Sequence, residues 1–199
     1  MIAILGKSEA TLTMIMDNLD SHKQYPALKI INNIDTPNKK LFIVEGFVIS
    51  ESLELGDEEF TFLGGTKVDT KLKLVEIFNP DIEKMINIFH KSAQISTTVK
   101  FGRGILINSL VSIGAYSEIG NYVNINRNSS VGHHTVIEDF CTIGPGTHIA
   151  GNIKIGRATS IGMGSIIRDG ITIGENSVIG MGSVIVKDVP ANSKIIQKK

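Results

Sequence analysis

An unbroken six-residue period runs through the second half of the chain. Large apolar side chains recur at every sixth position from Ile95 onward, and the residue that follows them is often glycine. The series continues through Phe101, Ile107, Ile113, Ile119, Ile125, Val131, Ile137, Ile143, Ile149, Ile155, Ile161, Ile167, Ile173, Ile179 and Ile185. Four residues after each of these, the side chain is small or β-branched. Fixed-period self-similarity indicates a repeat architecture.

A period of six predicts short strands that are each followed by a tight corner, so that three strands make a triangular coil of about 18 residues. The large apolar residues would fill the interior of a prism, and glycine tolerates the corner geometry. One coil cannot bury its own apolar side, so stacked coils must supply the core. Strands of a β-sandwich vary in length and alternate apolar with polar residues. An unbroken six-residue period therefore argues against a β-sandwich. We therefore predict a parallel β-helix over residues 94–189, followed by a tail at 190–199.

The first ninety residues have a different texture, with short apolar runs and helical periodicity. We expect strands at Ile2–Leu5, Leu28–Ile31, Leu41–Val44 and Phe60–Leu63, and helices after the N-cap residue Ser8 and after Thr66. Strand, helix and strand in this order predict a small α/β unit with a parallel sheet at residues 1–90.

Charge and cysteine content narrow the class of protein. The formal net charge is zero, which gives no reason to expect nucleic acid or an anionic membrane surface as a partner. No apolar run is long enough to span a bilayer, and the N-terminus lacks the features of a secretory signal. The single cysteine, Cys141, falls on an inward position of the repeat and is expected in the core. These features favour a cytoplasmic protein.

The repeat resembles the left-handed β-helix of the hexapeptide acyltransferases. A short Rossmann-like N-terminal half followed by this β-helix is similar to the sialic acid O-acetyltransferase and bacillosamine N-acetyltransferase group, most clearly from Asn126 to Asn152. The resemblance implies acetyl-CoA as acyl donor, a nucleotide-linked amino sugar as acceptor, and a homotrimer with active sites between subunits. The sugar expected from this group is a 4-amino-4,6-dideoxy sugar.

The family's catalytic histidine matches His133, which follows Val131 and Gly132 at an outward-facing corner. A neutral imidazole can act as a general base near pH 7. Gly151 lies one coil further along the same corner, so its N–H is a candidate oxyanion donor, although the glycine could equally serve the corner alone. Asn126 matches a family asparagine near the active site.

Two positions depart from the family pattern. The acidic residue that usually follows the catalytic histidine is replaced by His134, so Glu138, Asp139 or a carboxylate from another subunit would have to substitute. Thr142 stands where a relative has a histidine that touches the acetyl group, and its hydroxyl can still donate a hydrogen bond.

Further residues are expected to hold the two substrates. Pro145, Met163 and Met181 would stack into an apolar ridge, and the resemblance implies that this ridge lines the groove for coenzyme A. The turn Gly6-Lys7-Ser8 joins the first strand to the first helix, where backbone N–H groups can hold a phosphate. Asn32 and Asn33 follow the second strand, where the family binds the nucleotide.

Two other functions stay open, and a third is disfavoured. An O-acetyltransferase acting on a sialic acid-like sugar would use the same base. A β-helix scaffold without activity is the second alternative. A γ-type carbonic anhydrase needs histidines that converge on zinc, and the spacing of His133, His134 and His148 does not fit it. No metal is expected.

Overall fold

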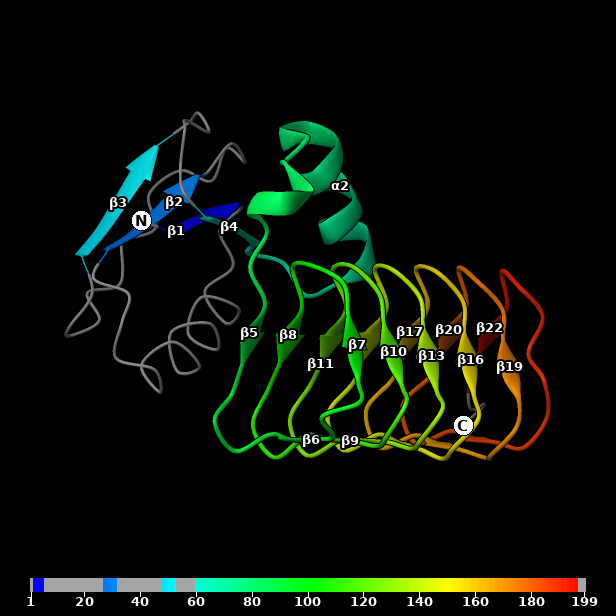
Figure 1. Cartoon of the computed structure of the whole chain (residues 1–199). Coiled ribbons are helices and arrows are strands. Elements are labelled where there is room, and N and C mark those ends of the chain that lie inside the picture. The colour runs from blue at the N-terminus through cyan, green and yellow to red at the C-terminus, as the bar shows by residue number, and fades with distance from the viewer. Residues whose placement is uncertain (1, 6–26, 32–47, 53–59, 197–199) are drawn as a thin grey trace.

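The computed structural model describes residues 2–5, 27–31, 48–52 and 60–196 of the 199-residue chain (Figure 1). The N-terminal part contains a parallel sheet in which β1 (Ile2–Leu5) lies between β2 (Ala27–Ile31) and β4 (Phe60–Leu63), with β3 (Val48–Ser52) beside β2. Three of the strands expected from the sequence are thereby confirmed. The strand β3 was not expected, and the proposed strand Leu41–Val44 and the helix after Ser8 lie outside the described residues.

Helix α2 (Val68–Phe78) follows β4 and confirms the helix expected after Thr66. It ends at Asn79, which adopts a left-handed conformation and donates its N–H to the carbonyl of Val75. A short 3₁₀ helix, η1 (Ile82–Lys84), then leads into the first coil of the β-helix.

The remaining strands form a parallel β-helix with three faces, as the six-residue period predicted (Figure 1). The seven-stranded face contains β5 (Ile88–Phe89), β8 (Leu106–Ile107), β11 (Asn124–Ile125), β14 (Thr142–Ile143), β17 (Ser160–Ile161), β20 (Val178–Ile179) and β22 (Lys194–Ile195). The six-stranded face contains β6 (Gln94–Ile95), β9 (Ser112–Ile113), β12 (Ser130–Val131), β15 (His148–Ile149), β18 (Ile166–Ile167) and β21 (Val184–Ile185). The five-stranded face contains β7 (Lys100–Phe101), β10 (Glu118–Ile119), β13 (Val136–Ile137), β16 (Lys154–Ile155) and β19 (Thr172–Ile173).

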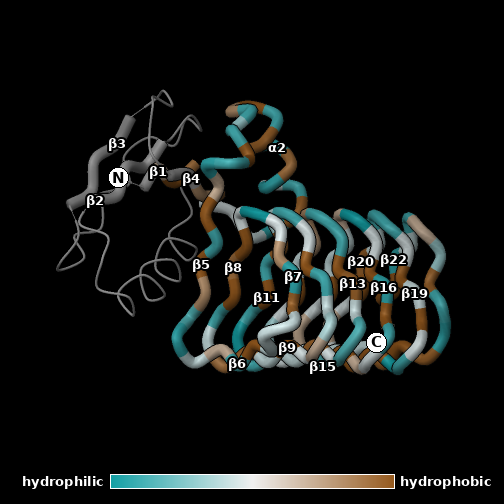
Figure 2. Tube along the Cα trace, viewed as in Figure 1, coloured by the Kyte–Doolittle hydropathy of each residue, from teal (hydrophilic) through white to brown (hydrophobic). Residues whose placement is uncertain are grey.

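The interior of the prism is filled by the six-residue series. From Ile107 to Ile185 its members are buried, and the brown segments that recur along the strands in Figure 2 mark them. The smaller inward residues are buried too, and many bond to the next coil: Ser129 Oγ donates to the carbonyl of Gly144, and Thr147 Oγ1 to that of Gly162. The hydroxyl groups of these residues are in this way hydrogen-bonded, which limits the cost of burying them.

The corners of successive coils stack into three edges of the prism, and each edge has different side chains. The histidine edge, between the six- and five-stranded faces, contains residues 114–117, 132–135 and 150–153. The methionine edge, between the seven- and six-stranded faces, contains residues 126–129, 144–147, 162–165 and 180–183. The helix edge, between the five- and seven-stranded faces, contains residues 102–105, 120–123, 138–141 and 156–159.

Helix α2 packs along the helix edge (Figure 1). Leu74 of α2 joins a buried cluster with Tyr122 and Phe140, whose rings stack with centroids 4.9 Å apart. Both aromatic residues have positive φ, which is unusual for bulky side chains and holds the rings outward beneath the helix. The guanidinium of Arg157 lies over the ring of Phe140, 4.9 Å from its centroid.

Lys71 anchors this packing from the middle of α2. It is 2% exposed, and its Nζ donates to the carbonyls of Tyr122, at 2.8 Å, and Cys141, at 2.9 Å. Burial lowers the pKa of Lys71 to about 7. A neutral amine has two N–H donors, which matches the two carbonyls that accept from it.

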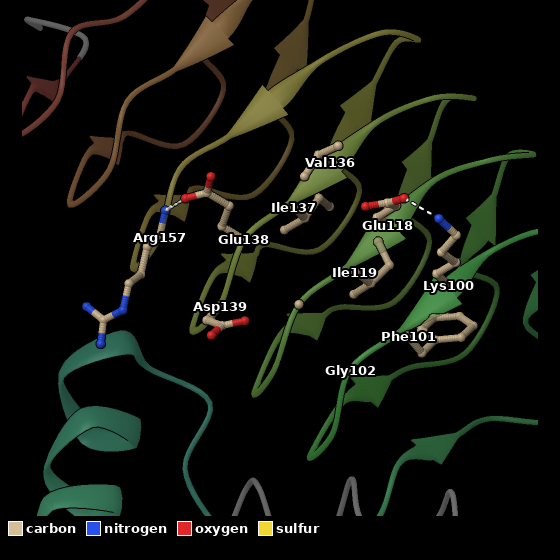
Figure 3. Close-up of a pocket in the computed structure, with 11 residues that line it drawn as sticks. Lys100, Phe101, Gly102, Glu118, Ile119, Val136, Ile137, Glu138, Asp139 and Arg157 are labelled. Carbon is tan, nitrogen blue, oxygen red and sulfur yellow. Dashed lines mark hydrogen bonds and ion pairs between the residues drawn. The ribbon is translucent and has the colours of Figure 1, made fainter. Parts of the chain in front are cut away.

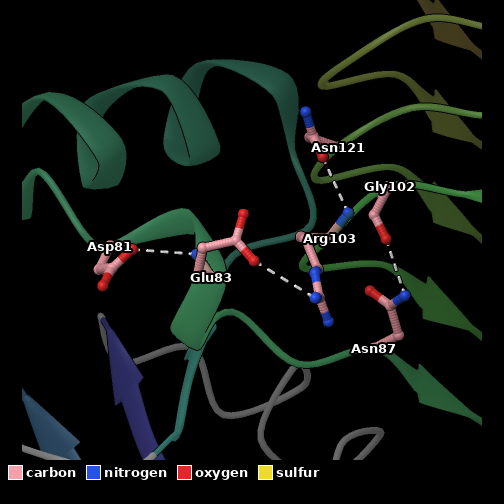
Figure 4. Close-up of polar contacts among 6 residues, drawn as sticks. All are labelled: Asp81, Glu83, Asn87, Gly102, Arg103 and Asn121. Carbon is pink, nitrogen blue, oxygen red and sulfur yellow. Dashed lines mark hydrogen bonds and ion pairs between the residues drawn. The ribbon is translucent and has the colours of Figure 1, made fainter.

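Polar contacts tie η1 to the first coils (Figure 4). Asp81 caps the short helix by accepting from the N–H of Glu83, and the carboxylate of Glu83 lies 3.4 Å from Arg103 Nη2. Asn87 donates to the carbonyl of Gly102 and accepts from the N–H of Ile105. These bonds fix the start of the β-helix relative to α2.

Candidate active site

His133 and His134 occupy the histidine edge, and both side chains are exposed. The backbone holds them in place, because Gly132 donates to the carbonyl of Ile149 and His134 donates to that of Ala115. His134 has a φ of 56°, so the two consecutive side chains leave the same corner. Their Nδ1 atoms lie 3.0 Å apart, and the rings meet edge to face with centroids 5.1 Å apart.

Tyr116 completes the group from the preceding coil. Its ring is exposed and packs against His134 with centroids 5.0 Å apart. Tyr116 was not among the residues singled out in the sequence. Its position, one full coil before His134, is the signal that could have found it.

Gly151 lies directly against the ring of His133. A Cβ atom added at Gly151 would sit 2.9 Å from both Cε1 and Nε2 of His133. Gly151 does not have a positive φ, so its backbone conformation does not require glycine. The equivalent position of the six-residue repeat holds other residues elsewhere: Ala115 on the same edge, Asp139 on the helix edge and Met163 on the methionine edge. The glycine is therefore explained by the space that the imidazole needs, rather than by the corner.

The N–H of Gly151 is also available. Within the described ranges, it donates to no other residue. On the helix edge, the same N–H groups are occupied by side chains: that of Asn121 donates to Asp139 Oδ1 and that of Arg157 to Glu138 Oε2. His133 and Gly151 thus place a ring nitrogen and a free backbone donor side by side.

The two nearest carboxylates in the sequence do not reach His133. Glu138 and Asp139 lie on the helix edge, at another corner of the prism. Glu138 Oε1 is 3.0 Å from Lys154 Nζ, and the hydrogen bond from Lys154 lowers the pKa of this carboxyl. The hypothesis that either residue of the same chain replaces the family's acidic partner is wrong, because each has its partners elsewhere.

Asn126, Met163 and Met181 form a second group on the methionine edge. Asn126 Oδ1 accepts from the N–H of Arg127, and Met163 and Met181 are 53% and 67% exposed. A Cβ at Gly144 or Gly162 would lie within 2.6 Å of the N of Met163 or Met181, so these coils stack closely. The six-stranded face separates this group from His133, so the group and the histidine do not meet within one chain.

Thr142 lies on the seven-stranded face, between the helix edge and the methionine edge. Its hydroxyl donates to the carbonyl of Thr66 at 2.6 Å. It borders a groove of about 430 Å³ between the start of α2 and the β-helix, which is lined by Lys67, Val68, Asp69, Leu72, Thr142, Ala158, Ser160, Asn176 and Val178. Within one chain this groove does not include His133 or Gly151.

A shallow hollow of about 410 Å³ lies on the five-stranded face (Figure 3). Its charged side chains include Lys100 and Glu118, which form an ion pair at 2.8 Å, and Glu138, which accepts from the N–H of Arg157. Glu138 and Asp139 line it, whereas His133 and Gly151 do not.

The remaining expectations have mixed outcomes. Cys141 is fully buried, as expected, and burial raises its pKa to about 12. Gly6, Lys7, Ser8, Asn32 and Asn33 lie outside the described residues. Across the described part of the chain, no three His, Cys, Asp or Glu side chains gather as a metal site. No helix within those same ranges is long and apolar enough to cross a membrane.

Known proteins resemble this chain in its repeats and in its fold. Residues 116–151 and 152–187 match the bacterial transferase hexapeptide family (six repeats). No curated protein matches the sequence. Among solved structures, a histidine-to-alanine mutant of GDP-perosamine N-acetyltransferase from Caulobacter crescentus, in complex with CoA and GDP-perosamine, superposes with a TM-score of 0.83. It is 23% identical, and the alignment covers 97% of this chain and 91% of that one.

Two further structures have the same fold. The acetyltransferase domain of PglB from Neisseria gonorrhoeae, in complex with acetyl coenzyme A, has a TM-score of 0.81 and 22% identity, over 95% of this chain and 92% of that one. WeeI from Acinetobacter baumannii has a TM-score of 0.64 and 21% identity, over 99% and 96%. Residues 116–187 thus match the hexapeptide repeats of bacterial transferases, and the chain shares its fold with these solved structures.

Proposed function

We propose that this protein transfers the acetyl group of acetyl-CoA to the amino group of a nucleotide-linked amino sugar, with His133 as general base. The observation that carries this proposal is the contact between His133 and Gly151, whose N–H is free. An imidazole beside an unused backbone donor is the pair that acyl transfer needs. The likeness in fold to proteins solved with CoA, acetyl coenzyme A and GDP-perosamine supports the choice of substrates.

Each residue would have a defined part in the reaction. Acetyl-CoA supplies the thioester carbonyl. The sugar nitrogen attacks this carbon, the C–N bond forms, and the C–S bond breaks to release the coenzyme A thiol. Nε2 of His133 would take the proton from the nitrogen and pass it to the departing sulfur. The N–H of Gly151 would donate to the carbonyl oxygen as its negative charge grows.

The separation of the two edges supports an assembly in which neighbouring chains share each site. Asn126, Met163 and Met181 could meet His133 only if the methionine edge of one copy lies against the histidine edge of another. Exposed apolar side chains continue around the methionine edge to Ile166 and Val184, as expected for a surface that a partner covers. A homotrimer would close such a head-to-tail contact. Thr142, Met163 and Met181 would then be candidates to contact the coenzyme A arm.

The finer features of the fold belong to the same proposal. We take residues 1–90 as a Rossmann-like unit that binds the nucleotide sugar through Gly6, Lys7, Ser8, Asn32 and Asn33. The four-stranded parallel sheet supports this, since such sheets bind ligands at the carboxyl ends of their strands. The β-helix is taken as left-handed, with its domain at 94–189 and a tail at 190–199, and the protein as cytoplasmic.

A turnover assay tests the proposal directly. Coenzyme A release from acetyl-CoA would be measured with a panel of nucleotide-linked amino sugars, for the wild type, His133→Ala and the matched control His148→Ala. We expect the first variant to lose at least ~100-fold, as for removal of a general base, and the control to retain activity. Turnover only with hydroxyl acceptors would favour a sugar O-acetyltransferase. Turnover that survives His133→Ala would show that His133 is not the base.

A further inference from the structure

The proposed base, His133, has a second histidine where a carboxylate would be expected. Nδ1 of His133 and Nδ1 of His134 are 3.0 Å apart, within hydrogen-bond distance. Two neutral imidazoles can share such a contact only if one nitrogen carries a hydrogen and the other has a free lone pair. The contact therefore couples the tautomers of the two rings.

Only one of the two arrangements suits a base beside Gly151. If His133 donates through Nδ1–H, its Nε2 has a free lone pair and can accept a proton, while Gly151 lies against the ring. If His134 donates instead, a neutral His133 must carry its hydrogen on Nε2, where it cannot accept a proton. The tautomer of a histidine is set by the partner of its other ring nitrogen.

We propose that His134 is a positioning residue, which accepts the Nδ1–H of His133 and so keeps Nε2 of His133 free as the base. This inference rests on the proposed function of His133. The ring of Tyr116, 5.0 Å from that of His134, supports the arrangement because it limits how His134 can turn. His134 thus does through a neutral nitrogen what a carboxylate does in a histidine–aspartate pair.

The surroundings of the pair offer no competing partner. Tyr116 lies on the preceding coil, and His148 on β15 directs its Nδ1 to Ser130 Oγ at 2.9 Å. Two coils after His133, Arg168 and Asp169 form an exposed pair with each other. In the part of the chain that the structure describes, no carboxylate or cation bonds to either imidazole of the pair.

A neutral partner has a consequence for pH dependence that a carboxylate would not have. A negative neighbour favours the charged form of an imidazole and raises its pKa, whereas a neutral one does not. One proton added to either ring disables the pair, because a protonated His134 no longer offers an acceptor at Nδ1. Activity would thus fall on the acid side at a lower pH than in a variant with a carboxylate at position 134.

The tautomer itself can be observed without any substrate. We would record long-range ¹H–¹⁵N spectra of the histidines in the full chain at pH 8, for the wild type and His134→Phe. We expect the hydrogen of His133 on Nδ1 in the wild type and a shift toward Nε2 in the variant. A wild-type His133 with its hydrogen on Nε2 would overturn the proposal, whether or not any amino sugar is acetylated.

The pH profile of kcat/KM gives the second readout. His134→Asp should keep turnover at pH 8 and move the acid limb to higher pH by about one unit. His134→Phe should lower kcat by roughly 10- to 100-fold, the usual effect of losing the group that orients a histidine. His148 is an exposed histidine on β15 of the six-stranded face, and His148→Asn is the matched control that should leave the limb in place. An unmoved limb in His134→Asp, with full activity in His134→Phe, would also overturn the proposal.

Discussion

Gly151 and the imidazole of His133 are in such close contact that a single added carbon at position 151 would lie 2.9 Å from two ring atoms. To make room for that carbon, the imidazole would have to turn away from the position that it now occupies beside Gly151. The backbone of Gly151 imposes no such penalty, since its φ lies in the range that any residue adopts.

We therefore expect Gly151→Ala to lower turnover by about 10-fold or more, because displacing a catalytic group by a fraction of an ångström disrupts the reacting geometry. The melting temperature should change little. Measurement of kcat beside thermal unfolding checks this. A variant that is fully active would mean that His133 does not need its present position.

Sharing of the site between chains predicts that two inactive variants restore each other. His133→Ala and Asn126→Ala affect different edges of the prism, so a mixed trimer contains some sites with both residues intact. If subunits mix at random, about one quarter of the sites regain wild-type composition, as the cyclic arrangement requires.

The experiment is to co-express the two variants and to compare turnover with that of each variant alone. Mixing the purified homotrimers without exchange serves as the control. Activity that never rises above the sum of the two variants would place Asn126 outside the site or confine the site to one chain.

Lys71 predicts a pH dependence of stability. Its pKa in the folded protein is about 7, against an ordinary value of 10.5, so folding disfavours the charged form. Below pH 7 the lysine is charged in both states and the full cost of burial is present. As the pH rises from 7 toward 10.5, only the unfolded chain still binds the proton, so the free energy of unfolding increases by up to ~1.4 kcal/mol per pH unit.

Lys71→Met should remove this dependence, because the methionine side chain does not titrate. Urea unfolding of both proteins at pH 7 and pH 9 measures the difference. The exposed Lys73→Met on the same helix is the control. Equal pH slopes for wild type and Lys71→Met would show that this amine is not buried in solution.

The thiol of Cys141 should be unreactive in the folded protein. Burial raises its pKa to about 12, so the thiolate that reacts with disulfide reagents is absent at pH 8. Its Sγ donates to the carbonyl of Gly156 at 3.1 Å, the same contact that Ser129 makes with Gly144 at the equivalent position of another repeat.

Cys141→Ser should then be tolerated within about 1 kcal/mol, because the hydroxyl can make this hydrogen bond. Titration with a thiol reagent before and after denaturation checks the first expectation, and thermal unfolding the second. Rapid modification of the native protein would contradict the burial of this side chain.

The β-helix could be predicted because its stabilising contacts are periodic in the sequence. The series through Ile125, Ile143 and Ile161 gives the coil and its register at once, and the position of Cys141 in it gave the burial of that thiol. The period also places Asn126 and His133 on consecutive corners, so it indicates that they cannot meet within one chain. Tyr116 could have been found from its place one coil before His134.

The contacts around Lys71 could not be predicted in this way. In the sequence it stands beside Leu72 as an ordinary helical lysine, and its partners Tyr122 and Cys141 are 51 and 70 residues away. The strand β3 was missed because Val48–Ser52 contains few apolar residues and pairs only with β2 at the edge of its sheet. Such tertiary contacts leave no periodic trace.

The register of the β-helix also limits how this chain could change its length during evolution. From β5 to β18, each strand of the β-helix pairs with the one 18 residues later, as Glu118 does with Val136. Only the last pair differs, because β20 and β22 are 16 residues apart. An insertion of any size other than 18 residues in a corner would have to bulge out as a loop, or it would turn every later side chain onto a different face. Whole coils, by contrast, could be gained or lost after residue 153 without disturbing the stacking of Gly151 on His133. Duplication of complete 18-residue units is therefore the natural route by which such a protein could lengthen while its active site stays intact.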